Sequence, residues 1–242
     1  MQLQGKTAIV TGAGRRLGAA IAEALASRGC NLLIHHHASP EPADELARRA
    51  NALGVQAHVA QADLARVEGV HRLFEYFDGC FARLDLLVNS AAIMQAVDLL
   101  TATEADWQRS MALNLKGPFF CLQQAALRMQ AHGGVIINIS DLAGQRPWRR
   151  FPIHSISKAG VDMLTRVAAM RLAPGVRVNG IAPGPVLKPE GMPLARWDQI
   201  GEALPLGRAG GPENVVQAVL FLAENDFITG ETIVVDGGDM LT

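Results

Sequence analysis

The feature of this chain that most limits its fold is a regular alternation of short apolar runs with longer amphipathic stretches. Seven runs have the length and residue types of strands: 7–10, 31–35, 55–59, 84–89, 134–140, 176–181 and 232–235. Seven stretches between or after them are typical of helices: 17–28, 43–53, 67–81, 104–113, 119–131, 155–172 and 212–223. Strand alternating with helix predicts a parallel sheet with helices on both faces.

Two of the expected strands, 84–88 and 135–137, are largely apolar without alternation, which indicates burial on both faces. No linker or repeat interrupts the pattern. We therefore expect residues 1–242 to form one Rossmann-like, doubly wound α/β domain with about seven parallel strands. The irregular stretch 183–205 carries five prolines, and we expect a loop there that acts as a lid.

The charge balance argues against a polyanionic partner. With 22 basic and 23 acidic residues the formal net charge is -1, so no strong field is available for nucleic acid or an anionic membrane surface. Three isolated cysteines favour no disulfide framework and fit a reducing cytoplasm. The chain shows no signal-peptide pattern and no apolar run of ~18 residues. We expect a cytoplasmic protein that binds a small molecule.

A glycine-rich turn, TGAGRRLG at residues 11–18, follows the first expected strand and opens a helix. Gly12, Gly14 and Gly18 let the backbone turn sharply and approach a pyrophosphate, whose charge the helix N-terminus favours. Arg16 and Leu17 lie in the same turn. The pattern predicts a dinucleotide site, and the alternative is an ordinary strand-to-helix turn.

The end of the second strand indicates which dinucleotide. NAD-binding folds usually carry a carboxylate ~20 residues after the glycines, but residues 34–39 read IHHHAS. A carboxylate would repel a 2'-phosphate, whereas His37, Ser39 and Arg16 can donate to it, so NADP(H) is the expected cofactor. We expect no metal site, because neighbouring histidines on a strand point to opposite faces.

Further motifs stand along the alternation. In chain order they are Ala-Asp-Leu at 62–64, Asn-Ser-Ala-Ala at 89–92, Asn114, Ser140, Ser-Lys-Ala at 157–159, Asn179 and Pro-Gly at 183–184. With the glycine turn, they make the chain resemble the short-chain dehydrogenase/reductase family essentially from end to end. That resemblance implies hydride transfer from the pro-S face of the nicotinamide to a C=O or C=N bond.

The resemblance also implies roles for single residues. Asp63 would hold the adenine edge, Lys158 would bind the nicotinamide ribose, Ser140 would steady the substrate oxygen, and Asn114 would hold a water in a proton relay. Each has a structural alternative, since such residues also cap turns, satisfy helix kinks or end strands. The implied cofactor-binding set is Gly12, Gly14, Arg16, Leu17, Gly18, His37, Ser39, Asp63, Leu64, Asn89, Ser90, Ala91, Lys158, Pro183, Gly184 and Val186.

Within that family the chain is most similar to pteridine reductases. The similarity rests on Arg16, on the His-x-His-x-Ser run from His35 to Ser39, and on Asp141 directly after Ser140. It implies a pterin-like heterocycle as substrate, with Arg16 facing it and Asp141 on its proton path. Ala38 departs from the pattern, because an arginine often stands there. Family members usually pair through helices matching 119–131 and 155–172, so we expect a homo-oligomer, a dimer or tetramer.

One expected catalytic residue is replaced. The family carries a tyrosine four residues before the lysine, but His154 stands there, on the same helical face as Lys158. A neighbouring lysine brings a phenol, with an ordinary pKa near ~10, within reach of neutral pH. The ordinary pKa of histidine is ~6.5 and a cation lowers it, so a neutral ring accepts a proton well and donates one poorly.

Three interpretations of His154 stay open. The ring can act as an imidazolium at lower pH with Asp141 lending negative charge, or Asp141 can pass protons through water while His154 orients the substrate. Otherwise His154 only fills space, and the protein is a dinucleotide-binding sensor or degenerate paralogue. The catalytic candidates are therefore Asn114, Ser140, Asp141, His154 and Lys158. A further departure is Lys188, where the family commonly has a threonine that bonds the nicotinamide amide; lysine cannot accept a hydrogen bond.

Overall fold

The seven strands lie parallel in one sheet in the order β3-β2-β1-β4-β5-β6-β7, in a computed structural model that describes all 242 residues. Their bounds are β1 Thr7–Val10, β2 Asn31–His36, β3 Ala57–Gln61, β4 Leu86–Asn89, β5 Gly134–Ile139, β6 Val176–Pro183 and β7 Thr232–Val235. The order reverses direction between β1 and β4. Ligands of such sheets bind outside the carboxyl ends of the strands at this switch point.

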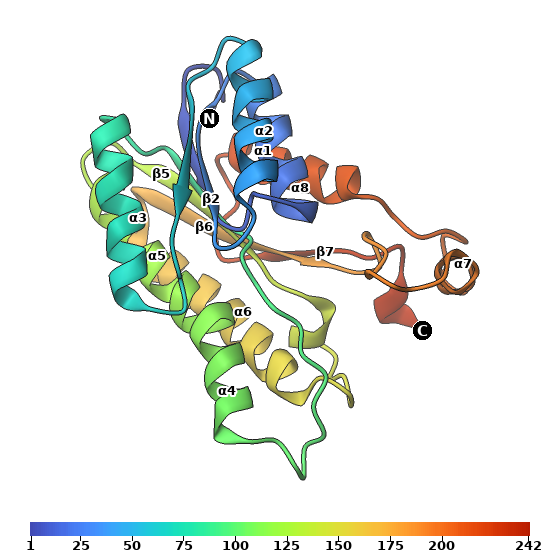
Figure 1. Cartoon of the computed structure of the whole chain (residues 1–242). Coiled ribbons are helices and arrows are strands. Elements are labelled where there is room, and N and C mark those ends of the chain that lie inside the picture. The colour runs from blue at the N-terminus through green and yellow to red at the C-terminus, as the bar shows by residue number, and fades with distance from the viewer.

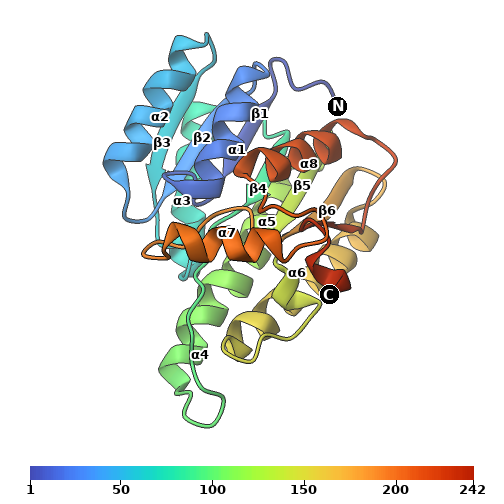
Figure 2. The same cartoon turned by 90° about the vertical axis from the view of Figure 1, so that its right-hand side faces the viewer.

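Helices cover both faces of the sheet, as the alternation predicts. Their bounds are α1 Arg16–Ser27, α2 Pro40–Ala52, α3 Val67–Cys80, α4 Glu104–Met111, α5 Gly117–Met129, α6 Pro152–Leu172, α7 Leu194–Glu202 and α8 Pro212–Glu224. Figure 1 shows α1, α2 and α8 on one side of the sheet and α3, α5 and α6 on the other. In the turned view of Figure 2, α4 projects at the lower end of the molecule and α7 crosses the front. No helix combines the length and apolar character that crossing a membrane requires.

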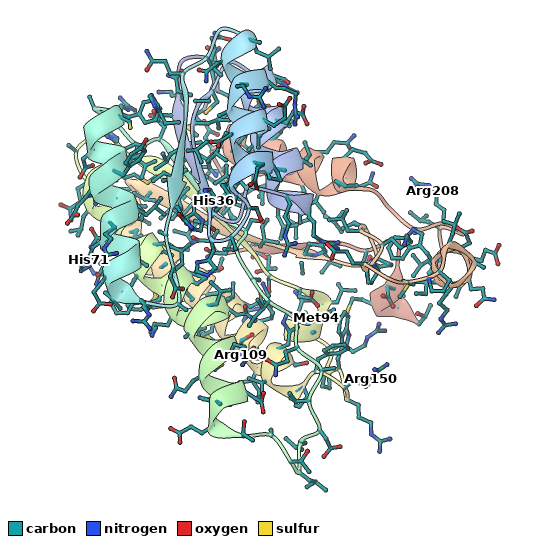
Figure 3. The ribbon with its side chains drawn as sticks, in the orientation of Figure 1. His36, His71, Met94, Arg109, Arg150 and Arg208 are labelled. Carbon is teal, nitrogen blue, oxygen red and sulfur yellow. The ribbon has the colours of Figure 1, made fainter.

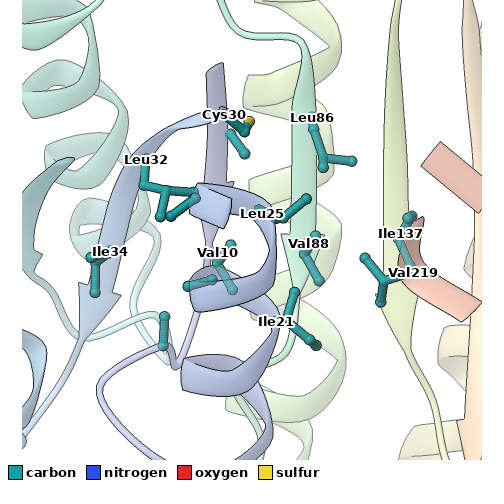
Figure 4. Packing of buried hydrophobic residues seen from close by; sticks show 14 of the residues in the cluster. Val10, Ile21, Leu25, Cys30, Leu32, Ile34, Leu86, Val88, Ile137 and Val219 are labelled. Atoms are coloured by element: carbon teal, nitrogen blue, oxygen red, sulfur yellow. The ribbon is translucent and has the colours of Figure 1, made fainter. Parts of the chain in front are cut away.

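The strands divide the core into two layers because successive side chains point to opposite faces. In β1, Ala8 and Val10 pack in the layer under α1, α2 and α8, whereas Ile9 packs in the layer under α3, α5 and α6. Figure 4 shows Val10 of the first layer among residues of the neighbouring strands and of α1, including Ile21 and Leu25. Burial on both faces explains why the strand sequences are apolar throughout.

The structure corrects the sequence prediction in two places. The stretch 183–205 is not irregular throughout, because α7 forms within it directly after Pro193; proline is compatible with the start of a helix, so the prolines did not exclude one. The helix expected over 104–113 ends at Met111 and continues as a π-helical turn, Ala112–Lys116, into α5. Such a π-helical insertion has no simple residue signature, and π-helical turns are frequent at functional sites.

The second core layer gives a stability prediction. Phe74 on α3 is fully buried, and the Arg128 guanidinium lies 4.9 Å from its ring centroid. Phe74→Ala removes a large side chain from a packed layer, so urea unfolding should show a loss of about 3–5 kcal/mol. Tyr76→Ala on the same helix is the control, because Tyr76 is 47% exposed, and it should change the unfolding free energy far less. Equal losses for both variants would contradict this packing.

Candidate active site

A cavity of about 860 Å³ lies across the carboxyl ends of the central strands. Most residues expected to bind a dinucleotide line it: Gly12, Gly14, Arg16, Leu17, Gly18, His37, Ser39, Asp63, Leu64, Ser90, Ala91, Lys158, Pro183, Gly184 and Val186. Ser140, Asp141 and His154 line it as well. Asn89 and Asn114 do not, and lie behind its wall.

The glycine turn packs directly against the end of β4. The hydroxyl oxygen of Thr11 accepts hydrogen bonds from the backbone N–H groups of Ser90, at 2.9 Å, and Ala91, at 3.1 Å. Gly12 has a φ of +66°, and a Cβ there would stand 2.8 Å from the Ala91 Cα. A Cβ on Gly18 would collide with the carbonyl oxygen of Gly12. The close approach of these segments therefore requires glycine at both positions.

Arg16 is the exception in the turn. Its φ is +55°, and it is the one residue other than glycine with a positive φ. A left-handed conformation costs a residue with a Cβ about 1–2 kcal/mol. The side chains of Arg16 and Arg15 point toward Glu190 in the segment after β6, at 3.6 and 3.9 Å between nitrogen and carboxylate oxygen. Both arginines line the cavity, so their exposed contacts with Glu190 lie across its opening.

His35 anchors the turn from β2, a contact that sequence reasoning missed. Its Nδ1 accepts from the Gly12 N–H at 3.0 Å, and its Nε2 lies 3.1 Å from the Ala62 carbonyl oxygen, to which it donates. Only a neutral ring can do both. Burial lowers the pKa of His35 to about 4, which keeps the ring neutral. The sequence signal was an apolar strand that ends in three histidines.

Two asparagines support the cavity from behind. Asn89 donates to Asn138 at 2.9 Å, and Asn138 donates to the Thr165 hydroxyl at 2.9 Å, which joins β4, β5 and α6 in a buried chain of hydrogen bonds. Asn114 lies in the π-helical turn and bonds both backbone groups of Ile93, accepting from its N–H at 2.9 Å and donating to its carbonyl at 2.8 Å. These contacts fix the segment after β4, which forms part of the cavity wall.

His154 lies between this segment and Asp141. Its Nδ1 is 3.2 Å from the Ile93 carbonyl oxygen and 3.4 Å from the Asn114 amide nitrogen. Its Nε2 is 3.5 Å from a carboxylate oxygen of Asp141 and has no hydrogen-bond partner, although the atom is buried. No group of the chain satisfies this nitrogen, so it is free to form a hydrogen bond with a substrate.

Lys158 follows His154 by one helical turn and is also buried. Its ammonium group donates to the Ile139 carbonyl at 2.8 Å. Burial lowers the pKa of Lys158 to about 8, and the negative charges of Asp141 and Asp162 oppose the shift. Burial also raises the pKa of Asp162.

Lys188, which stands where the family commonly has a threonine, does not line the cavity. Its ammonium group donates to the Met192 carbonyl at 2.6 Å and is exposed, whereas the neighbouring Leu187 lines the cavity. The lysine therefore neither replaces nor blocks a cavity contact here. A long, charged side chain reaches water more easily than a threonine would, which explains its outward position.

Comparisons with known proteins agree with this geometry. A family model described as "Enoyl-(Acyl carrier protein) reductase" matches residues 12–239. A 3beta-hydroxysteroid dehydrogenase 1 from Eggerthella lenta is 36% identical, over 98% of this chain and 94% of its own. A 2-dehydro-3-deoxy-D-gluconate 5-dehydrogenase from Escherichia coli K12 is 35% identical, over 98% and 96%. The crystal structure of a candidate short-chain alcohol dehydrogenase from Sinorhizobium meliloti 1021 superposes with a TM-score of 0.92 at 30% identity and covers 99% of this chain and 98% of its own.

The His35 contact gives a prediction with a defined sign. The folded state keeps His35 neutral down to about pH 4, whereas an unfolded chain protonates histidine below 6.5. The stabilisation is therefore complete above pH 6.5 and is lost as pH falls toward 4, by up to about 3 kcal/mol. Unfolding titrations of wild type and His35→Asn over this range should show a smaller pH dependence in the variant. His71→Asn, at an exposed position on α3, should keep the wild-type dependence, and an unchanged slope in His35→Asn would contradict the assignment.

Proposed function

The chain belongs to the short-chain dehydrogenase/reductase family, and from this we propose that it is an NADPH-dependent oxidoreductase acting on a C=O or C=N bond. The observation that carries the proposal is one cavity that has a glycine turn on one wall and Ser140, His154 and Lys158 on another. Its volume of about 860 Å³ is in the range of small-molecule and cofactor sites.

The residues around the turn fit a dinucleotide phosphate. A Cβ on Gly14 would approach Ser39 to 3.0 Å, so the glycine keeps the turn open beside the end of β2. Arg16, His37 and Ser39 would hold the 2'-phosphate, Asp63 the adenine, and Lys158 the nicotinamide ribose. When bound, NADPH supplies the hydride. Every further step falls to side chains of this chain.

We assign the proton to His154. A ring protonated at both nitrogens would find an acceptor on each side, the Ile93 carbonyl at Nδ1 and Asp141 at Nε2. Substrate oxygen placed between Nε2 and the Ser140 hydroxyl would then receive the Nε2 proton, with Asp141 stabilising the charged ring. Asn114 keeps Ile93, and through it His154, in position. The alternative route, through water at Asp141, leaves His154 to orient the substrate.

For the substrate we propose a pterin-like heterocycle. Asp141, one of the positions at which the chain is most similar to pteridine reductases, lines the cavity beside His154, whereas Arg16, another, is assigned above to the 2'-phosphate. The relatives named above include enzymes of a steroid and of a sugar acid, which supports reduction of a carbon–oxygen double bond as the common reaction. We also propose a homo-oligomer that pairs through α5 and α6, which present exposed apolar side chains: Phe119, Leu127, Ile156, Met163, Val167 and Met170.

A second candidate function is dinucleotide binding without turnover. The replacement of the family tyrosine by His154 is the observation that favours it. In that case the cavity would bind NADPH with the same contacts, and no carbonyl or pterin compound would accelerate NADPH oxidation.

The cofactor assignment predicts that the protein binds NADPH more tightly than NADH, which a binding titration can measure. Followed by cofactor fluorescence, wild type should bind NADPH at least 10-fold more tightly than NADH, since charge-assisted hydrogen bonds to a phosphate are worth ~1.5–3 kcal/mol. Arg16→Gln should lose most of this preference. Arg28→Gln, after the far end of α1, should keep it. Equal affinities of wild type for NADPH and NADH would exclude the assignment.

The His154 assignment predicts a gain of function. His154→Tyr places a phenol beside Lys158, which is charged below its pKa of about 8, and reduction near pH 7 should rise by ~10²- to 10⁴-fold. The wild type should instead reduce faster as pH falls, because the proposed step requires a ring protonated at both nitrogens. Both are measured as NADPH oxidation with a panel of ketones, aldehydes and pterins. If the variant binds NADPH normally and gains no rate, His154 does not replace the tyrosine; if neither protein turns over any compound, binding without turnover is the better account.

A further inference from the structure

Arg109 on α4 is a charged residue of the cavity that the proposed reaction does not use. It lines the same space as His154, together with Ile93, Met94 and Leu113. Building on the proposed function, we propose that the substrate carries an anionic group, a carboxylate or a phosphate, and that Arg109 binds this group while the bond to be reduced lies at His154.

Arg109 has no direct ion-pair partner in this chain and can therefore bind a ligand. Three arginines line the cavity, and of these Arg15 and Arg16 both face Glu190, whereas Arg109 forms no ion pair and no hydrogen bond. The carboxylate of Asp106, one turn earlier on α4, is already engaged: one oxygen accepts from Gln95 at 2.6 Å and the other from the Thr103 hydroxyl at 2.6 Å.

The remaining acids of the cavity are also engaged. Asp141 lies 3.5 Å from the ring of His154, and Asp63 lies 3.5 Å from the guanidinium of Arg66. Arg109 therefore makes no direct contact with a carboxylate of this chain, while the charge of Asp106 acts on it from one turn away. Its guanidinium can still pair directly with an anionic group of a ligand.

Arg109 lies on the same cavity wall as the segment beside His154. Arg109 and Leu113 are four residues apart and both line the cavity, and Leu113 directly precedes Asn114, which holds that segment through Ile93. Figure 3 shows Arg109 on α4 and Met94 on the segment after β4 in the same lower part of the molecule.

The rim of this end of the cavity adds positive charge. Arg149 and Arg150, on the loop before α6, form no ion pair, and the Arg150 carbonyl accepts from the Val97 N–H at 3.2 Å, which joins this loop to the one after β4. Figure 3 places Arg150 beside the same region. Arg149 and Arg150 do not line the cavity and would attract an anion without selecting its shape, whereas Arg109, although exposed, lines the cavity, where a guanidinium can bind a carboxylate or phosphate through two parallel hydrogen bonds.

The test measures binding separately from turnover. The probes are acetoacetate and 4-oxopentanoate, each with its neutral methyl ester, and dihydroxyacetone phosphate with dihydroxyacetone. Calorimetry in the presence of NADP⁺, which cannot reduce them, gives affinities, and NADPH oxidation gives kcat/KM. The proteins are wild type, Arg109→Gln, Arg109→Lys and, as control, Arg171→Gln at an exposed and unpaired arginine near the end of α6.

We expect at least one anionic probe to bind wild type and Arg171→Gln at least 10-fold more tightly than its neutral partner. Arg109→Gln should weaken that probe by roughly 10- to 100-fold and leave the neutral partner within twofold. Arg109→Lys should lie between, because lysine keeps the charge and loses the paired hydrogen bonds. Whether the ketoacids or the phosphate respond identifies the anion.

Two results overturn the proposal: no anionic probe binds wild type more tightly than its neutral partner, or Arg109→Gln weakens both partners equally, as a structural role would. Failure of the proposed reductase function would give a result distinct from failure of the Arg109 proposal. Anion binding through Arg109 without any NADPH oxidation removes the reductase proposal alone, and rapid reduction of neutral compounds with no preference for anions removes the Arg109 proposal alone.

Discussion

The site depends on a backbone contact that only glycine permits, the approach of the first strand-to-helix turn to the end of β4. Gly12 meets Ala91 without room for a Cβ, and Thr11 holds the same segment through two backbone N–H groups. His35 fixes the turn from β2 by accepting from the Gly12 N–H. The carboxyl ends of three strands are thereby held together, and the cavity lies directly outside them. A neutral His35 is part of this arrangement, because a protonated ring would turn an acceptor into a donor facing another donor.

At the other end of the cavity, charged side chains rather than backbone contacts determine the arrangement. Lys158 is a buried cation whose ammonium group has one carbonyl partner, and Asp141 and Asp162 oppose the effect of burial on its pKa. Asp141 also lies beside His154, so a single carboxylate acts on both His154 and the Lys158 cation. The buried amide of Asn114 ties the segment after β4 to the π-helical turn, and the Ile93 carbonyl faces Nδ1 of His154. The proton chemistry proposed for this site follows from these fixed neighbours.

Much of the fold could be predicted from the sequence, because alternation of apolar strands and amphipathic helices is read from residues near in sequence. Strand and helix positions were therefore correct within a few residues. The glycine turn, Ser140, Asp141, His154 and Lys158 all line one cavity, since parallel strands bring their carboxyl ends together.

What sequence reasoning missed depends on three-dimensional contacts. The bond between His35 and Gly12, the bond between Gln95 and Asp106, and the outward position of Lys188 involve partners that no local pattern specifies. Asn89 and Asn114 belong to motifs, yet their place behind the cavity wall follows from buried amide partners. The sequence did not predict helix α7, because the prolines around it are compatible with the start of a helix as well as with a loop.

The account is tested most directly by the fate of the hydride. Wild-type protein would be incubated with NADPH deuterated at the 4-pro-S position and with the panel of ketones, aldehydes, ketoacids and pterins, and the products analysed by mass spectrometry. The account predicts that a reduced product acquires the deuterium and that the NADP⁺ formed has lost it. Tight NADPH binding with no deuterated product from any compound, or a reduced product while the deuterium remains on the cofactor, would contradict it.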